Sequence, residues 1–148
     1  MEAKGIREFL AGRRYGALAT QSLDLPGYPF GSLVPYCLDR QGCPILRLSA
    51  LAQHTRNILK NPKASLTVWD VREEDILGST RVTCLGDVVK VTGEEAEQAH
   101  ERYDAGFPMA GAFGELDFSF FKLKPVRIRY ILGFGRMGWV EASEYESA

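Results

Sequence analysis

The spacing of apolar and polar residues changes along the first part of the chain, and each change predicts an element. Between Met1 and Arg14 the apolar residues recur on one helical face, which predicts an amphipathic helix. From Tyr15 to Thr20 the run Y-G-A-L-A-T has the length and the flanks of a strand. The two prolines and the glycine within 26–29 then predict a turn or loop.

A hairpin and a helix are predicted next. Gly31–Asp39 and Pro44–Ser49 have the composition of strands, and the four residues that end in Gly42 form a turn between them. The apolar residues of Ala52–Lys60 then take the spacing of a helix. Asn61-Pro62 ends this helix, because proline has no N–H to donate and restricts the residue before it.

The second half of the chain is rich in strand-forming residues. Its predicted elements are a strand over Ala64–Trp69, a long strand over Arg81–Thr92, a helix over Glu94–Tyr103, a short segment at Phe118–Phe121, a strand over Val126–Phe134 and a closing strand at Gly138–Val140. Gly86, inside the long strand, marks the place of a bulge. The acidic run Glu73-Glu74-Asp75 is interpreted as a solvent-exposed loop between strands, and the last few residues as loose.

These elements define a mainly β fold of the α+β class: a small closed or partly closed barrel of six or more antiparallel strands with helices on its outside. No repeat or linker divides the chain, so residues 1–148 are expected to form a single domain. Strands and helices do not alternate regularly, and no G-x-G-x-x-G follows a strand. Both observations argue against a Rossmann dinucleotide-binding fold.

Composition and charge narrow the range of partners. Hydrophobic residues make up 45% of the chain and charged residues 25%, which is typical of a globular protein. With a formal net charge of -1 the chain has no overall positive field, so nucleic acid is not an expected partner. Its apolar runs are shorter than the roughly 20 residues that a membrane span requires. Because the opening segment also lacks the apolar stretch of a signal peptide, we expect a cytoplasmic protein.

The cysteines and histidines predict neither a disulfide framework nor a metal site. Cys37, Cys43 and Cys84 are an odd number without C-x-x-C spacing. His54 and His100 do not form a pair or a His-carboxylate cluster with metal-ligand spacing. A G-x-S-x-G motif is also absent from the sequence. Catalytic residues are therefore left unassigned, and no protein-bound metal is expected.

The stretch Ile45–Pro62 carries the most informative chemistry. A strand ends there in small polar residues and runs directly into a helix whose first turn contains His54, Thr55 and Arg56. The free N–H groups and the positive end of the helix dipole attract anions, and hydroxyl and cationic side chains add charge-assisted hydrogen bonds. Such a turn is a candidate phosphate site. The alternative interpretation is a helix cap at Ser49 or Thr55 together with surface cations.

The same stretch resembles a known family. Its strand, helix and N-P, followed by A-S-L-T-V, resemble the pyridoxamine phosphate oxidase-like flavin proteins, and S-A-L-A-Q-H-T-R-N-I is more similar still to the haem-utilisation branch of that superfamily. Further similar segments are Y-G-A-L-A-T, G-S-L-V-P-Y, R-V-T-C-L-G and a closing region with G-F-G-R, at 15–20, 31–36, 81–86 and 127–139. The resemblance covers nearly the whole chain.

This resemblance implies a split barrel that forms a homodimer, with FMN bound between the two subunits. The residues expected at the flavin phosphate are Arg47, Ser49, His54, Thr55 and Arg56, and the backbone of Ser32, Leu33 and Val34 is expected to line the ring. Arg81 stands where the oxidase has a glutamine near the ring. A positive charge at that place favours the anionic reduced flavin.

Departures from the family pattern bear on activity. The oxidase's phosphate-binding arginine and lysine align with Gln53 and His54, so the phosphate clamp carries less charge here. The oxidase's C-terminal substrate-binding segment has no clear counterpart, so pyridoxamine phosphate is not the expected substrate. The haem-utilisation branch usually has an additional C-terminal domain, for which this sequence has no counterpart either.

Three functions are considered on these grounds. The first is an FMN-dependent oxidoreductase that acts on an unidentified small molecule, with the chemistry carried by the cofactor because no side chain is an obvious acid or base. The second is a haem-binding or haem-utilisation protein that uses the same cleft, with Arg47, Arg56 and Arg81 near the propionates. The third is a non-catalytic split barrel that serves as an interaction module. His54 is accordingly a hydrogen-bond donor to a phosphate, a haem ligand or a polar residue at a helix start.

Overall fold

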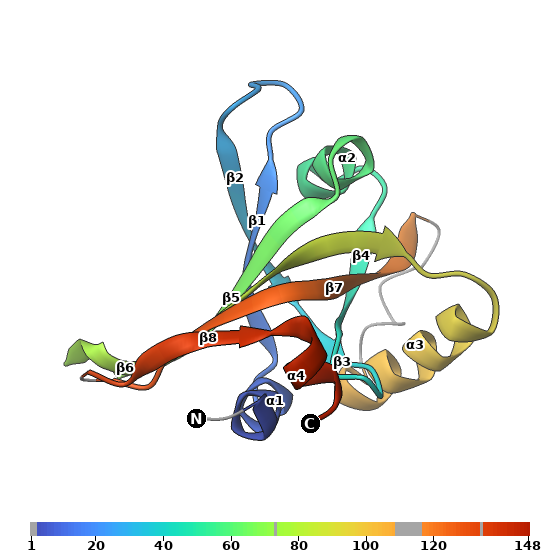
Figure 1. Cartoon of the computed structure of the whole chain (residues 1–148). Coiled ribbons are helices and arrows are strands. Elements are labelled where there is room, and N and C mark those ends of the chain that lie inside the picture. Colours follow the sequence, from blue (N-terminus) through green and yellow to red (C-terminus); the bar gives the residue numbers. More distant parts are fainter. Residues whose placement is uncertain (1–2, 73, 109–116, 134) are drawn as a thin grey trace.

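Eight strands and four helices make up the part of the chain that the structure describes, and the strands form one curled antiparallel sheet (Figure 1). The computed structural model describes residues 3–72, 74–108, 117–133 and 135–148. The strands are β1 (Tyr15–Gln21), β2 (Pro29–Pro35), β3 (Cys37–Leu38), β4 (Pro44–Ser49), β5 (Lys63–Arg72), β6 (Asp75–Lys90), β7 (Phe118–Ile131) and β8 (Met137–Glu141). The helices are α1 (Ala3–Ala11), α2 (Gln53–Lys60), α3 (Gly93–Gly106) and α4 (Ala142–Glu146). The strand order is β2-β1-β5-β6-β7-β4-β3, and β8 also pairs with β7.

One face of the sheet forms the main core. Its central row runs across β1, β5, β6, β7 and β8 through directly paired residues: Leu18, Leu66, Cys84, Ile128 and Val140. Each of these residues is at most 5% exposed. Directly paired residues of antiparallel strands point to the same face, so the row is one continuous apolar layer. α1 covers it with Ile6 and Leu10, which lie four positions apart on one helical face, and α2 adds Ile58.

The opposite face, which we call the outer face, is lined by small, polar and aromatic residues. One row of directly paired residues on it consists of Ala17, Thr67, Thr83, Arg129 and Trp139. The hydroxyl oxygens of Thr67 and Thr83 lie 3.0 Å apart and share a hydrogen bond. All five residues are exposed or half-buried.

Most of the predicted elements are confirmed. β4 has the predicted bounds, β1 and α2 agree with prediction to within one residue, and α3 contains the predicted helix. The turn that ends in Gly42 joins β3 to β4, and Gly42 has a φ of +88°, a conformation that favours glycine. The predicted fold class, an α+β protein built mainly from an antiparallel sheet, is also confirmed. No helix of the described residues is long and apolar enough to cross a membrane.

β7 corrects the prediction of two separate segments, Phe118–Phe121 and Val126–Phe134. The structure joins them into one strand of 14 residues that ends at Ile131, and Phe134 lies outside the described residues. Pro125 does not break this strand because it lies at a bulge. The pairing of β6 with β7 shifts between Leu85 and Gly86, where a bulge was predicted, but the extra residue is Val126 of β7 and not a residue of β6.

β5 and β6 form a hairpin that extends beyond the two predicted strands, which end at Trp69 and begin at Arg81. Asp70 pairs with Thr80, and Arg72 pairs with Asp75 closer to the tip of the hairpin. In this part of β6 the apolar residues Ile76 and Leu77 are neighbours and both exposed, whereas Ser79 is buried, so the alternating apolar pattern that identifies a strand is absent. Glu74 and Asp75 are exposed, as expected of the acidic run, and Glu73 lies outside the described residues.

Tyr36 divides the predicted strand Gly31–Asp39 into β2 and β3. Its side chain is 1% exposed, and its hydroxyl donates to the carbonyl of Leu10 at 2.5 Å. Its backbone N–H donates to the carbonyl of Arg14 at 2.9 Å instead of to a strand. Residue 36 therefore connects the sheet to the end of α1, which finishes at Ala11 rather than at the predicted Arg14.

The end of the chain is ordered, contrary to prediction, because Tyr145 of α4 is fully buried. Its hydroxyl donates to the carbonyl of Gly42 at 2.7 Å, and a side chain at position 42 would collide with the Tyr145 ring. The last helix is thus attached to the β3–β4 turn, which lies 103 residues earlier in the chain.

We expect Tyr145→Phe to lower the free energy of unfolding by about 1–2 kcal/mol, because the carbonyl of Gly42 would lose its buried partner. Chemical denaturation measures this change. Tyr15→Phe is the matched control, since Tyr15 is 58% exposed, and it should leave stability unchanged. Equal stabilities for the two variants would contradict the role given to the Tyr145 hydroxyl.

Candidate functional site

The first turn of α2 begins without a side-chain cap. The N-cap residue is Ala52, which has extended backbone angles. The Ser49 hydroxyl instead accepts a hydrogen bond from the backbone N–H of Leu51 at 3.2 Å, and Thr55 is already the third residue of the helix. The alternative interpretation of a cap at Ser49 or Thr55 is therefore wrong. The first N–H groups of a helix have no partner within it, so those of α2 are available to a ligand.

Asn57 attaches α2 to β1 and to the segment after β1. It is 0% exposed. Its Nδ2 donates to Thr20 Oγ1 at 3.0 Å, while its Oδ1 accepts from the backbone N–H of Leu23 at 3.0 Å and from Gln53 Nε2 at 2.9 Å. A buried amide must be hydrogen-bonded, so these three bonds fix the position of the helix. Asn57 was not among the predicted site residues, although a polar residue beside Ile58 on the buried face of an amphipathic helix could have indicated it.

Four buried side-chain atoms have no hydrogen-bond partner among the described residues: Ser32 Oγ, His54 Nε2, Thr55 Oγ1 and Arg81 Nε. Nearly all buried polar atoms in proteins have a partner, so each exception needs an explanation such as a ligand or an ordered water. All four atoms belong to residues that the sequence analysis places at the ligand site. Three of them lie on β2 and α2, two elements that contact each other.

His54 contributes hydrogen bonding rather than charge. Burial lowers the pKa of His54 below its ordinary value of 6.5, because desolvation disfavours the charged imidazolium. The imidazole is therefore neutral at pH 7, and an anion beside it meets a polar group without a full positive charge.

β2 presents its three predicted residues on alternate faces. Ser32 pairs with Leu18 and lies on the core side, as does Val34, which is 2% exposed. Leu33 pairs with Ala17 on the outer face and is 67% exposed. The structure therefore brings only Ser32 and Val34 of this strand to the side on which α2 packs.

The predicted cations Arg47 and Arg56 have different surroundings. Arg47 extends from β4 over the ring of Phe118, with 4.2 Å between its guanidinium carbon and the ring centroid. Burial raises the pKa of Tyr103 in α3, and the charge of Arg47 partly offsets this rise, so Arg47 also faces α3. Arg56 is exposed on α2.

Arg81 lies on the outer face, on the opposite side of the sheet from α2. It pairs directly with Trp69, whereas Thr20, to which α2 is attached, lies on the core side at the level of Gly86. Arg81 is five positions from Gly86 along β6, which is about 17 Å at 3.3 Å per residue. One copy of the chain therefore does not bring Arg81 to the first turn of α2.

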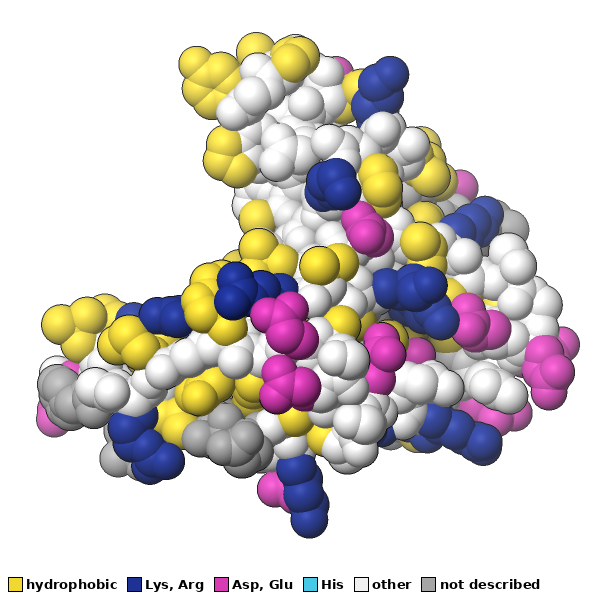
Figure 2. Space-filling view, in the orientation of Figure 1, with side chains coloured by type: hydrophobic (Ala, Val, Ile, Leu, Met, Phe, Trp, Pro, Cys, Tyr) yellow, Lys and Arg dark blue, Asp and Glu magenta, His cyan; other side chains and the backbone are white. Residues whose placement is uncertain are grey.

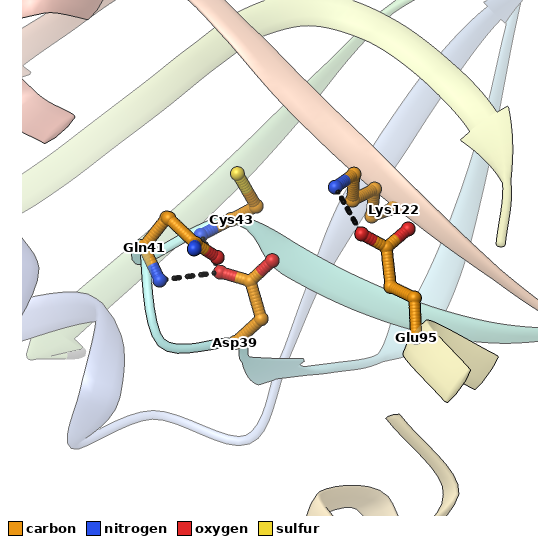
Figure 3. A network of polar contacts seen from close by, with 5 residues as sticks. All are labelled: Asp39, Gln41, Cys43, Glu95 and Lys122. Atoms are coloured by element: carbon orange, nitrogen blue, oxygen red, sulfur yellow. Dashed lines mark hydrogen bonds and ion pairs between the residues drawn. The ribbon is translucent and has the colours of Figure 1, made fainter. Parts of the chain in front are cut away.

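A second polar cluster lies between the β3–β4 turn, β7 and α3 (Figure 3). One carboxylate oxygen of Asp39 accepts hydrogen bonds from the backbone N–H groups of Gln41 and Cys43, each at 2.9 Å. Lys122 forms an ion pair with Glu95 at 2.8 Å. These contacts close the turn and attach α3 to β7 beside a cavity of about 310 Å³, which no predicted site residue lines.

The described thiols are not activated for catalysis. Burial raises the pKa of Cys37 and of Cys43 to about 11, and that of Cys84 to about 12. The reactive form of cysteine is the thiolate, which is scarce at neutral pH under these conditions. Among the described residues, no group of His, Cys, Asp and Glu side chains could hold a metal ion.

A curled antiparallel sheet in which β4 leads directly into a helix beside β1 and β2 defines a split barrel, and the chain belongs to the pyridoxamine 5'-phosphate oxidase family. The model of that family, described as pyridoxamine 5'-phosphate oxidase, matches residues 3–132. This match confirms the split-barrel fold that the resemblance implied.

Similar proteins carry names that refer to haem. The chain is 37% identical over 147 residues to the chloroplastic heme oxygenase HOZ of Arabidopsis thaliana, a match that covers 97% of the chain and 45% of HOZ. It is 29% identical over 139 residues to the heme oxygenase HutZ of Vibrio cholerae, covering 88% of the chain and 76% of HutZ. A solved structure of a heme binding protein from Mycobacterium smegmatis is 32% identical with a TM-score of 0.90, covering 99% of the chain and 60% of that protein. The chain thus spans less than two thirds of HOZ and of the mycobacterial protein, and its resemblance to the haem-utilisation branch is confirmed.

We expect the free energy of unfolding to fall as the pH is lowered through 6.5, the ordinary pKa of histidine. Below that pH the unfolded chain binds a proton at His54, whereas the folded chain, whose His54 pKa is lower, does not. His54→Gln should therefore flatten the pH profile of stability in this range, and His100→Gln should leave the contribution of His54 in place. A His54→Gln profile parallel to that of the unsubstituted protein would contradict the burial of this imidazole.

Proposed function

We propose that this chain binds haem between two copies, and that the bound haem undergoes an oxidative reaction of the kind that the names of HOZ and HutZ describe. One observation carries the proposal: four buried polar atoms, on Ser32, His54, Thr55 and Arg81, have no partner among the described residues. A ligand group or an ordered water would satisfy such atoms. The haem proteins among the relatives favour haem as that ligand.

The residues present fit the chemical groups of haem. Its propionates are singly charged carboxylates, which N–H and hydroxyl donors and a guanidinium can hold. The first turn of α2 supplies its backbone N–H groups, the neutral His54 and the hydroxyl of Thr55. Arg81 supplies a positive charge and an unpartnered Nε. Bound haem would supply the redox chemistry, while these residues would bind and orient it.

The outer face supports the approach of a flat ring. Ala17, Thr67 and Thr83 are adjacent on it through direct pairing, and their short side chains leave the surface low. Trp69, which pairs with Arg81, adds an aromatic side chain at one end of this surface. Small residues with an aromatic and a cationic neighbour are a suitable lining for a flat, apolar ligand that carries anionic groups.

A homodimer would supply both parts of the site. Arg81 and α2 lie on opposite faces of one copy. In a two-fold symmetric dimer, Arg81 of each copy would face α2 of the other copy, so the same contact would form twice. Figure 2 shows hydrophobic side chains at the end of the β1–β2 hairpin and over β6 and β8, with a hollow between them. Leu25, Tyr28 and Leu33 on this hairpin are 64%, 66% and 67% exposed. Exposed apolar patches of this kind mark interaction surfaces.

The flavin hypothesis has weaker support than the haem hypothesis. The family includes pyridoxamine 5'-phosphate oxidase, but HOZ and HutZ are heme oxygenases and the mycobacterial relative is a heme binding protein. A non-catalytic module is the remaining hypothesis.

The cytoplasmic location and the absence of a nucleic-acid partner stay predictions from the sequence.

The first test is a titration of the purified protein with haemin, followed by absorbance in the Soret region. We expect saturable binding, and Arg81→Ala should weaken it about 10-fold or more, because a hydrogen bond to a charged group contributes roughly 1.5–3 kcal/mol. Arg40→Ala is the matched control, since Arg40 is exposed in the β3–β4 turn and should leave haemin affinity unchanged.

The same sample tests the reaction and the alternatives. Addition of ascorbate under oxygen, with catalase present, should bleach the Soret band and release iron. Binding of haemin without this loss would limit the function to haem binding. Uptake of FMN without uptake of haemin would favour the flavin hypothesis, and uptake of neither would favour the non-catalytic module. Sedimentation of the ligand-free protein as a monomer at all concentrations would contradict the proposed dimer.

A further inference from the structure

We propose that the first turn of α2 is an anion site whose buried and half-buried side chains carry no charge, that it accepts carboxylates and discriminates against phosphate, and that Gln53 and His54 determine this specificity. The inference rests on the proposed function, because it concerns the same site. It explains at the level of side chains why a member of a phosphate-binding fold family would hold haem propionates in preference to the phosphate of FMN.

The half-buried side chain of Gln53 uses one N–H of its amide within the protein. Gln53 is the first residue of α2, and its Nε2 donates to Asn57 Oδ1 at 2.9 Å. Asn57 is 0% exposed and is itself held by Thr20 and Leu23. The Gln53 amide therefore completes a partly buried hydrogen-bond network and adds no charge to the start of the helix.

The next two residues offer polar groups without charge. His54 is half-buried, and its Nε2 has no partner in the described part of the chain. Burial lowers its pKa, which keeps the imidazole neutral at pH 7. Thr55 is 2% exposed, and its hydroxyl is the second buried group of this turn without a partner. Arg56, the first cation of the helix, is exposed. A ligand anion at this turn would thus meet donors but no buried cation.

This chemistry suits a carboxylate better than a phosphate. A phosphate monoester carries a charge of about −1.5 to −2 at pH 7, and a carboxylate carries −1. The start of a helix is equivalent to only about half a positive charge, and removing an anion from water is costly unless countercharges replace the lost hydration. The residues of this turn therefore do not fit the FMN phosphate, whereas their hydrogen-bond donors are sufficient for a carboxylate.

Substitutions that add charge to this turn test the inference by a gain of binding. The readout is the ratio of the dissociation constants of riboflavin and FMN, since the two ligands differ only in the phosphate. For the unsubstituted chain we expect a ratio within about threefold of one. Gln53→Arg and, separately, His54→Lys should each raise the ratio at least tenfold through tighter FMN binding. Unfolding cannot produce such a gain, and the second variant keeps the test valid where Gln53→Arg disturbs the Asn57 network.

Leu59→Arg is the matched control. Leu59 is 68% exposed in the last turn of the same helix, so this variant adds the same charge at a distance from the first turn and should leave the ratio unchanged. A ratio above tenfold in the unsubstituted chain would overturn the inference. The inference would also be overturned if Gln53→Arg and His54→Lys gained no more FMN affinity than Leu59→Arg does.

A comparison of haemin with its dimethyl ester separates this inference from the proposed function. If the unsubstituted chain binds haemin at least tenfold more tightly than the ester, the propionates are held, as both proposals require. Failure to bind haemin at all would overturn the proposed function, whatever the ratio of the flavins. Normal haemin binding together with strong selection of FMN over riboflavin would overturn only the specificity assigned to Gln53 and His54.

Discussion

The buried carboxamide of Asn57 is the constraint on which the site depends. Both ends of this amide are hydrogen-bonded, one to β1 through Thr20 and the other to Leu23 and Gln53. Because a buried polar group that loses its partner costs free energy, α2 cannot slide or rotate on the sheet without breaking several of these bonds together. The helix start is consequently held in one orientation beside β2. The buried atoms of Ser32, His54 and Thr55 that have no partner among the described residues lie on this helix and on β2, which contacts it.

The sequence predicted those parts of the fold that follow local rules. Strands with alternating residues, the helix that ends before Pro62 and the place of the bulge beside Gly86 all depend on neighbours in the chain or on the backbone of one residue. It did not predict the burial of Tyr145, because the partner of that hydroxyl is Gly42, far away in sequence. It also missed the strand residues of Asp75–Thr80, since a hairpin outside the core lacks the apolar alternation that identifies a strand.

The candidate site was also predicted only in part: the residue types were predicted, but the directions of the side chains were not. The residue types around His54 and Thr55 indicated an anion site, and buried atoms without partners now lie on both residues. The direction of each side chain could not be read from the sequence: Arg47 faces Phe118 and α3, and Arg81 faces away from α2. Which face a strand residue occupies depends on register, and which partner a buried amide finds depends on the whole fold. A split barrel can host different ligands, so the side chains at one helix start carry more information about function than the barrel does.

The position of Arg81 on the outer face also has a thermodynamic consequence. In the proposed dimer, a ligand that contacts α2 of one copy and Arg81 of the other connects the two subunits. Binding and assembly are then linked equilibria: the factor by which dimerisation raises ligand affinity equals the factor by which the ligand raises dimer affinity. Apparent affinity would depend on protein concentration. In a cell, the supply of ligand would then set how much of this protein is assembled.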